Sequence, residues 1–136
     1  VFAVPEAVCL VPSAHPLAAR TTLAPEDLAD ARFVSLASED AARARIDRLF
    51  EQAGVRRRIV VETQYSVTIC NLVRNGVGVS LVNPLALEGL DRAGLIVIPF
   101  KPRVHFRTLL ITPPSGTLSQ VAGAFLAEAK RQLALG

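Results

Sequence analysis

The sequence has no tryptophan, no methionine and only one tyrosine, although hydrophobic residues make up 51% of its 136 residues. Its core must therefore consist mainly of valine, leucine, isoleucine and alanine, which is typical of domains that combine helices with buried strands. A chain of this length forms about one domain and can bury roughly 68% of its unfolded surface. The composition thus predicts a globular α/β domain.

Long hydrophobic runs are also missing. No run approaches the ~20 consecutive apolar residues that a membrane-spanning helix requires, so no membrane partner is expected. The first residues lack the basic segment, apolar stretch and cleavage site of a secretory leader, and we expect a cytoplasmic protein. Because the first residue is Val1, we also expect the natural chain to begin further upstream.

The residues that chemistry usually requires are few and scattered. Cys9 and Cys70 lie in apolar runs, which predicts two reduced, buried thiols, and neither has metal-ligand spacing. His15 and His105 have no nucleophile nearby in the sequence, and His15 is expected to stabilise a turn. The glycines of Gly76-Val77-Gly78 follow a predicted helix rather than a strand, which excludes a dinucleotide fingerprint. We therefore predict no enzyme activity, no cofactor and no metal.

The charge pattern gives little sign of direct nucleic-acid binding. The net charge is +3, but basic and acidic residues alternate along most of the chain. The one basic cluster, Arg56 to Arg58, is predicted to be a solvated start to a strand. No helix-turn-helix or aromatic-basic pattern is visible, so this chain itself is not expected to contact DNA.

One stretch, residues 58–84, predicts a strand, a polar loop, a helix, a glycine turn and a second strand. Ile59-Val60-Val61 has the composition of a strand buried on both faces. Ser66 is predicted to cap the helix, whose apolar residues repeat at helical spacing until Asn75-Gly76 ends it. Two strands joined in this way form a βαβ unit with parallel strands.

A second βαβ unit is predicted over residues 33–61. The strand 32–36 leads to a helix capped by Ser38 and ended by Gly54. Arg43 and Asp47 are predicted to form an exposed pair on its wet face. The helix has one apolar stripe, which consists of Ala42, Ile46, Leu49, Phe50 and Ala53. The other expected elements are strands at 7–11, 95–98 and 103–112, one helical turn at 25–28, a short helix at 85–90 and a final helix at 118–133.

Ligands of open α/β sheets bind beyond the carboxyl ends of parallel strands. Two loops qualify, 35–39 and 62–66, and they lie side by side if their strands are neighbours. Glu39 and Glu62 are candidate partners for an amine or guanidinium group, while a helix N-terminus favours a carboxylate. For single residues the alternative stays open that Ser66 only caps and Glu62 is only solvated. The predicted ligand contacts are Ser35, Ala37, Ser38, Thr63, Gln64, Tyr65 and Ser66.

Several motifs together resemble one family. In chain order they are AVCLVPSAHPLA, LAPEDLADARFVSL, ARIDRLFEQAG, VETQYSVTICNLVRNGVGVSLVNP and RTLLITPPSGTLSQVAGAFL. This pattern covers nearly the whole chain and resembles the effector-binding domain of LysR-type transcriptional regulators. The residues of the fourth motif are most similar to the corresponding stretch of regulators that sense amino acids or opines.

The resemblance implies a fold like that of type 2 periplasmic binding proteins, with two α/β subdomains, mostly parallel sheets and an effector between them. Residues 1–107 would form subdomain II, and residues 108–136 would be the returning strand and C-terminal helix of an incomplete subdomain I. It also implies a homodimer or tetramer that binds DNA through a winged helix-turn-helix outside this chain. The last strand and helix would need a partner surface, such as another copy of the chain.

An exported solute-binding protein would share this architecture and remains the alternative function. A leader peptide upstream of Val1 would favour that alternative, whereas a winged helix-turn-helix there would favour the regulator.

Overall fold

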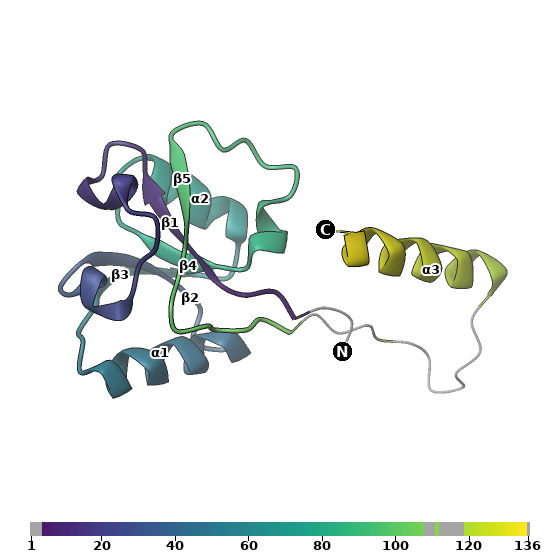
Figure 1. Cartoon of the computed structure of the whole chain (residues 1–136), viewed down its shortest axis with the longest axis horizontal. Helices are drawn as coiled ribbons and strands as arrows, with labels where there is room; N and C mark the ends of the chain where they lie inside the picture. The colour runs from purple at the N-terminus through teal and green to yellow at the C-terminus, as the bar shows by residue number, and fades with distance from the viewer. Residues whose placement is uncertain (1–3, 108–110, 112–118, 136) are drawn as a thin grey trace. The chain divides into compact units, whose positions relative to one another are not determined.

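The computed structural model describes residues 4–107, 111 and 119–135 (Figure 1). The chain divides into two compact units, Pro5–Phe106 and a second made of Val1–Val4 with Arg107–Gly136. The assignment of residues 1–107 and 108–136 to two subdomains stays a prediction. The larger unit contains β1 (Val8–Pro12), η1 (Pro16–Ala19), η2 (Pro25–Leu28), β2 (Arg32–Leu36), α1 (Ala41–Ala53), β3 (Arg58–Thr63), α2 (Ser66–Arg74), β4 (Ser80–Val82), η3 (Pro84–Leu87) and β5 (Leu95–Pro99).

The strands of the larger unit are mixed in direction. β2 pairs with β3 in parallel, and an isolated parallel bridge joins Phe33 to Val79 just before β4. β1 pairs antiparallel with β4 on one side and with β5 on the other. Both predicted βαβ units are confirmed as parallel, with β2 lying between β3 and β4. The prediction of a mostly parallel sheet was wrong in this detail, because β1 runs against both of its neighbours.

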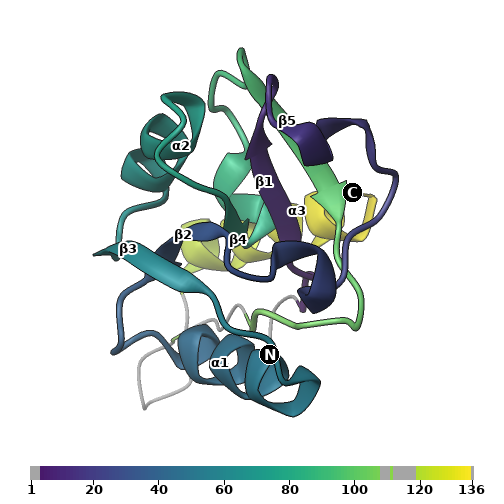
Figure 2. The same cartoon turned by 90° about the vertical axis from the view of Figure 1, so that its left-hand side faces the viewer.

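Helices α1 and α2 lie on opposite sides of the strands, as two perpendicular views show (Figures 1 and 2). The apolar stripe of α1 is confirmed at Ala42, Ile46 and Phe50, which are buried, whereas Leu49 is half-buried and the prediction was wrong for Ala53, which is exposed at the end of the helix. On α2 the buried residues are Ile69, Cys70 and Val73, whereas Val67 is exposed. The spacing of apolar residues thus identified the inward faces of both helices.

β3 is less buried than its sequence predicted. Ile59 and Val60 are 37% and 39% exposed, so the expectation of a strand covered on both faces was wrong. Within the described part of the chain β3 pairs only with β2, which makes it an edge strand. A β-branched composition fits a half-covered edge strand as well as a central one, so composition alone could not distinguish them.

The cap residues of both helices differ from the prediction. Asp40, not Ser38, caps α1, because its carboxylate accepts a hydrogen bond from the Ala42 amide at 2.8 Å. Ser66 is the first residue of α2, and the preceding Tyr65 makes no capping bond with its side chain. Several polar residues stand before each helix in the sequence, and the backbone geometry selects among them.

The centre of the core joins three phenylalanines. The ring centroid of Phe50 is 6.2 Å from that of Phe33 and 6.2 Å from that of Phe100. Cys9 and Cys70 are free and buried, as predicted, and burial raises the pKa of the Cys9 thiol to about 12. His15 stabilises its turn, also as predicted, by accepting a hydrogen bond from the Leu17 amide at 3.1 Å.

Near the end of the larger unit the chain returns beside its beginning. An antiparallel bridge joins Glu6 to His105 in place of the long strand predicted over 103–112, of which residues 108–110 and 112 lie outside the described residues. In the second unit, α3 spans Gln120–Leu135 and so confirms the predicted final helix, although residues 118 and 136 are not described. Its Phe125 side chain is exposed.

Candidate functional site

The candidate site begins where two parallel strands end side by side. Leu36 on β2 is the register partner of Thr63 on β3. Directly beyond them, the Ala37 amide donates a hydrogen bond to the Thr63 carbonyl at 3.1 Å. The loops that follow the two strands therefore start at the same edge of the sheet, as the sequence predicted. We call residues 37–40 and 63–66 the loop pair.

The predicted contact residues in the loop pair differ in accessibility. Ser38 and Gln64 are exposed, and Tyr65 is 64% exposed. The half-buried ones are Ala37, Thr63 and Ser66. The structure thus brings six of the seven predicted residues together at one edge.

Ser35 lies one layer deeper than the other predicted residues. It is only 1% exposed, and its hydroxyl donates a hydrogen bond to the Leu36 carbonyl at 3.0 Å. Its hydroxyl is therefore already hydrogen-bonded at the end of β2, and Ser35 is a buried residue beneath the loop pair.

The two helix N-termini at the loop pair differ in their capping. The α1 terminus is closed by the Asp40 carboxylate. At α2 the side chains of the loop bond to one another: the Gln64 amide donates to the Tyr65 hydroxyl at 3.0 Å, and the Tyr65 amide donates to the Thr63 hydroxyl at 3.3 Å. The N-cap residue of α2 is Tyr65, and its side chain makes no capping hydrogen bond. The backbone amides at the start of α2 are therefore better placed than those of α1 to donate hydrogen bonds to an acceptor group of a ligand.

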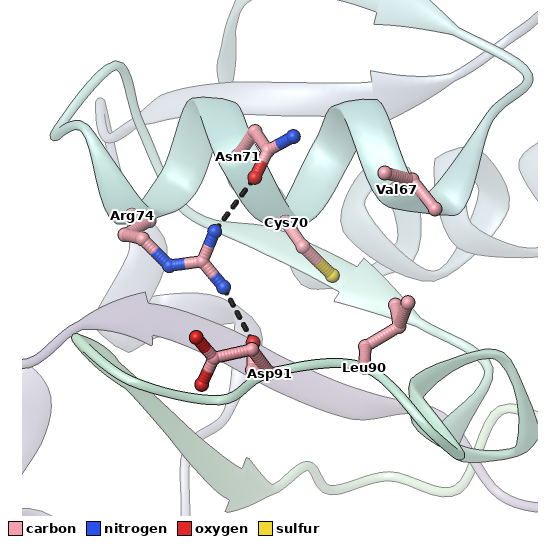
Figure 3. A pocket seen from close by; sticks show the side chains of 6 residues that line it. All are labelled: Val67, Cys70, Asn71, Arg74, Leu90 and Asp91. Carbon is pink, nitrogen blue, oxygen red and sulfur yellow. Dashed lines mark hydrogen bonds between the residues drawn. The ribbon is translucent and has the colours of Figure 1, made fainter.

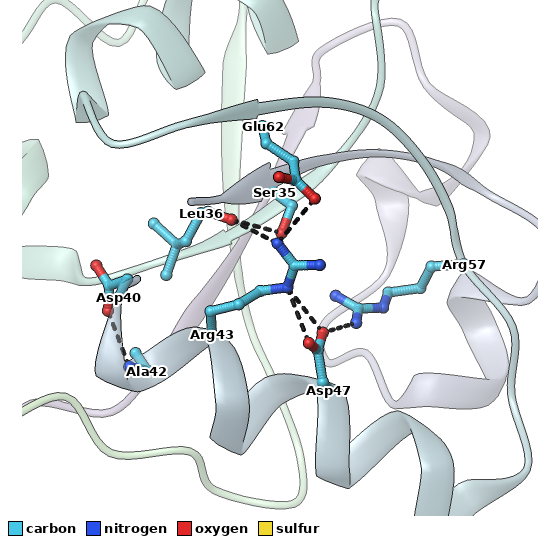
Figure 4. A network of polar contacts seen from close by, with 8 residues as sticks. All are labelled: Ser35, Leu36, Asp40, Ala42, Arg43, Asp47, Arg57 and Glu62. Carbon is cyan, nitrogen blue, oxygen red and sulfur yellow. Dashed lines mark hydrogen bonds and ion pairs between the residues drawn. The ribbon is translucent and has the colours of Figure 1, made fainter. Parts of the chain in front are cut away.

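A side chain that the sequence placed on the wet face of α1 instead connects the site's strands (Figure 4). Arg43 donates hydrogen bonds to the Leu36 carbonyl at 2.9 Å and to the Glu62 carboxylate at 3.1 Å. It also pairs with Asp47 at 2.9 Å, and its side chain is only 13% exposed. The predicted pair is therefore confirmed, with an Asp47 side chain that is 39% exposed, but the prediction that Arg43 is exposed was wrong.

The charges around Arg43 balance. Burial alone would lower the pKa of Arg43, but the hydrogen bonds that it donates to the Asp47 and Glu62 carboxylates outweigh burial and raise the pKa above its ordinary value. Glu62 is thus already matched by a cation, which weakens its candidacy as the partner of a ligand amine. Glu39 remains an exposed carboxylate in the loop pair.

The same network continues to Arg57, which was predicted to be solvated. Its side chain is 6% exposed and pairs with Asp47. Its guanidinium carbon lies 4.7 Å from the ring centroid of Phe33 and 4.4 Å from that of Phe50, so two aromatic faces enclose the charge. Burial lowers the pKa of Arg57, although the Asp47 carboxylate opposes that effect. Arg57 therefore belongs to the core.

A small pocket of about 160 Å³ lies between α2 and the segment around Leu90 (Figure 3). Arg74 borders it, but its guanidinium is bonded to the Ala93 carbonyl at 2.7 Å, to Asn71 at 2.6 Å and to the Asp91 carbonyl. Cys70 also borders it, and burial raises the pKa of its thiol. Because the cation is already used within the protein, this pocket offers little to orient a polar ligand. Its lining residues are Val67, Cys70, Asn71, Arg74, Leu90 and Asp91.

Residues 4–107, 111 and 119–135 contain no group of three or more histidine, cysteine or acidic side chains arranged to hold a metal ion. Over the same ranges, no helix combines the length and the apolar composition needed to cross a bilayer.

Parallel strands that end together, followed by two helices that begin there, belong to an α/β domain with the type 2 periplasmic-binding-protein-like fold. The LysR substrate binding domain family matches residues 3–134, and the chain belongs to this family. The transcriptional activator protein LysR of Escherichia coli is 39% identical over 122 residues, which are 88% of this chain and 39% of that protein. The chain thus spans well under half of this curated relative.

Solved structures agree on the fold. The Synechocystis CcmR regulatory domain in complex with 2-PG superposes with a TM-score of 0.75 at 18% identity, covering 97% of this chain and 64% of that one. The effector-binding domain of QuiR in complex with shikimate gives a TM-score of 0.69 at 19% identity, covering 96% of this chain and 62% of that one. At such low identity these likenesses establish the fold alone.

Proposed function

We propose that this chain is the small-molecule sensing part of a LysR-type transcriptional regulator and binds its effector at the loop pair. The observation that carries the proposal is the register of β2 and β3, which brings two polar loops and two helix N-termini to one edge. The proposed contacts are Ala37, Ser38, Thr63, Gln64, Tyr65 and Ser66, supported by Ser35. Domains of the same fold, CcmR and QuiR, were solved with 2-PG and shikimate, both small polar molecules.

The chemistry of the loop pair favours a zwitterion, such as an amino acid or an opine. The uncapped α2 terminus offers backbone amides to a carboxylate. Glu39 offers an exposed carboxylate to an ammonium or guanidinium group, while Glu62 is already paired with Arg43. The residues of the loop pair include no lysine or arginine, so a ligand with several negative charges suits the site less well.

The wider role follows from the family. We propose that effector binding shifts the equilibrium between two arrangements of a homodimer or tetramer, whose winged helix-turn-helix domains bind DNA in the cytoplasm. An effector can shift that equilibrium only by its difference in affinity for the two arrangements. The chain itself would act as a sensor and catalyse no reaction. Membership in a regulator family does not favour an exported solute-binding protein.

Replacing Gln64 and Ser66 together with alanine should weaken effector binding roughly 5- to 150-fold, because each lost hydrogen bond contributes about 0.5–1.5 kcal/mol and every 1.4 kcal/mol is a factor of ten. The measurement is a thermal-shift screen with L-lysine, L-arginine, their opine conjugates and shikimate, followed by titration calorimetry on each hit. The exposed Ser13 is the matched control, because it follows β1, which runs opposite to β4 and therefore ends at the other edge of the sheet.

A Ser13→Ala chain should bind like the wild type. Unchanged affinity in the Gln64→Ala, Ser66→Ala double variant, with an unaltered circular dichroism spectrum, would show that the effector binds elsewhere.

A further inference from the structure

We propose that α1 couples the loop pair to the two chain segments that connect the larger unit to the smaller one. Arg43 makes the contact with the strand ends next to the loop pair, and Arg45 makes the contact with one of the connecting segments. The segments are residues 5–7 and 104–106, which lead into the smaller unit at Val4 and Arg107. The part of this inference that concerns an effector rests on the proposed function, whereas the coupling of loop to segment does not.

The connecting segments are held together by a short antiparallel bridge. The Ala7 amide donates to the Val104 carbonyl at 2.7 Å, and the Phe106 amide donates to the Pro5 carbonyl at 2.9 Å. These two bonds flank the facing residues Glu6 and His105, whose own amide and carbonyl groups therefore point away from the bridge. The His105 carbonyl thus needs a partner on its outer side.

Arg45 supplies that partner. Its Nη1 donates a hydrogen bond to the His105 carbonyl at 2.8 Å across 60 residues of sequence. The buried neighbours of His105, which are Val104 and Phe106, fix the segment to the core, so the carbonyl presents a defined position to α1. The second turn of α1 is thereby attached to one of the two segments that leave the unit.

Arg43 attaches the same helix to the site. It bonds the last residue of β2 and the Glu62 carboxylate on β3, directly before the loop pair. Positions 43 and 45 are about 200° apart around a helix, so the two arginines extend from nearly opposite sides of α1. One rigid helix thus contacts the strand ends and the connecting segment at once.

The loop pair continues directly into α1. The Asp40 amide donates to the Ala37 carbonyl at 3.0 Å, and the Asp40 carboxylate caps the first turn. A ligand that moves residues 37–40 must therefore move the start of α1 or break the cap. Because Arg45 lies about one turn further along, that movement reaches the His105 carbonyl. This supplies a physical connection, which a claim of coupling between sites requires.

Amide hydrogen exchange on the whole chain tests the coupling without any ligand. The amides of Ala7 and Phe106 report on the bridge, and the Leu10 amide in the central strand β1 reports on global unfolding. Relative to Leu10, Arg45→Ala should speed exchange at both reporters roughly fivefold, the factor expected for one net hydrogen bond. Asp40→Ala, which removes the α1 cap, should speed it about threefold in the wild type and not at all in the Arg45→Ala background.

Arg48→Ala is the matched control, since Arg48 is an exposed arginine on the same helix, and it should leave both reporters unchanged. The coupling is wrong if Asp40→Ala leaves the reporters unchanged, or if its effect persists in full without Arg45. Because the cycle contains no ligand, a wild-type chain that binds none of the screened compounds would overturn the proposed function alone. If a compound binds, it should alter reporter exchange in the wild type and not in Arg45→Ala at saturation.

Discussion

Arg57→Ala should lower the free energy of unfolding by about 3 kcal/mol, the low end of the range measured when one partner of a buried ion pair is removed, because the Asp47 side chain is 39% exposed. The substitution takes away the cation that pairs with Asp47 and removes the guanidinium that lies over the rings of Phe33 and Phe50. Asp47 retains its bond to Arg43, which keeps the loss from being larger. Urea unfolding followed by circular dichroism measures the change.

Two further variants separate the causes. Arg57→Met keeps most of the apolar side-chain volume against the rings of Phe33 and Phe50 but carries no charge. It should lower the free energy of unfolding by less than Arg57→Ala, because well-packed apolar replacements of buried ions are often tolerated. Arg58→Ala removes an exposed arginine next to it and should change stability by less than about 0.5 kcal/mol. Equal effects of Arg57→Ala and Arg58→Ala would show that Arg57 is solvated, as the sequence first indicated.

Gly78→Ala should destabilise the chain by about 3 kcal/mol, at the upper end of the usual cost of overpacking. A Cβ at this position would lie 2.6 Å from the Arg32 carbonyl oxygen, which is backbone and has no side-chain freedom to move away. The same oxygen accepts a hydrogen bond from the Val79 amide at 2.9 Å, so the added methyl group would push β2 away from the start of β4. Thermal unfolding should show the loss as a lowered Tm.

Gly76→Ala provides the comparison in the same turn. Gly76 has a φ of 79° and open space around its Cβ position, so alanine there adds backbone strain but no clash. Its expected cost is about 1 kcal/mol. If Gly78→Ala cost no more than Gly76→Ala, the close approach of the two strands would not be what requires glycine at position 78.

Local patterns were sufficient to predict most of the framework. The apolar runs at 33–36 and 59–61, with an amphipathic stripe between Ala42 and Phe50, predicted the parallel βαβ arrangement that the structure confirms. Once the strands were known to be parallel neighbours, their polar ends had to meet at one edge, which is why the loop pair was predictable.

What the sequence could not reveal depends on contacts between distant residues. Arg43 and Arg57 look like ordinary surface arginines, and only the packing of α1 against β2 and η2 brings them to Asp47 and shields their side chains from solvent. The edge position of β3 depends on the order of the strands, and the composition of β3 would suit an edge strand or a central strand. The choice of Asp40 over Ser38 as a cap reflects a difference of two residues, within the usual uncertainty of helix ends.

The exposed edge of β3 gives the basic cluster a role other than nucleic-acid binding. In the part of the chain that the structure describes, the outer edge of β3 pairs with no strand and its Ile59 and Val60 are exposed; such an edge is a template on which an identical strand from another molecule can add, the first step of aggregation. Charged side chains on such strands oppose that addition, and Arg56 and Arg58 stand exposed at the start of β3. Like-charge repulsion between copies thus protects the chain where its hydrogen bonding is incomplete.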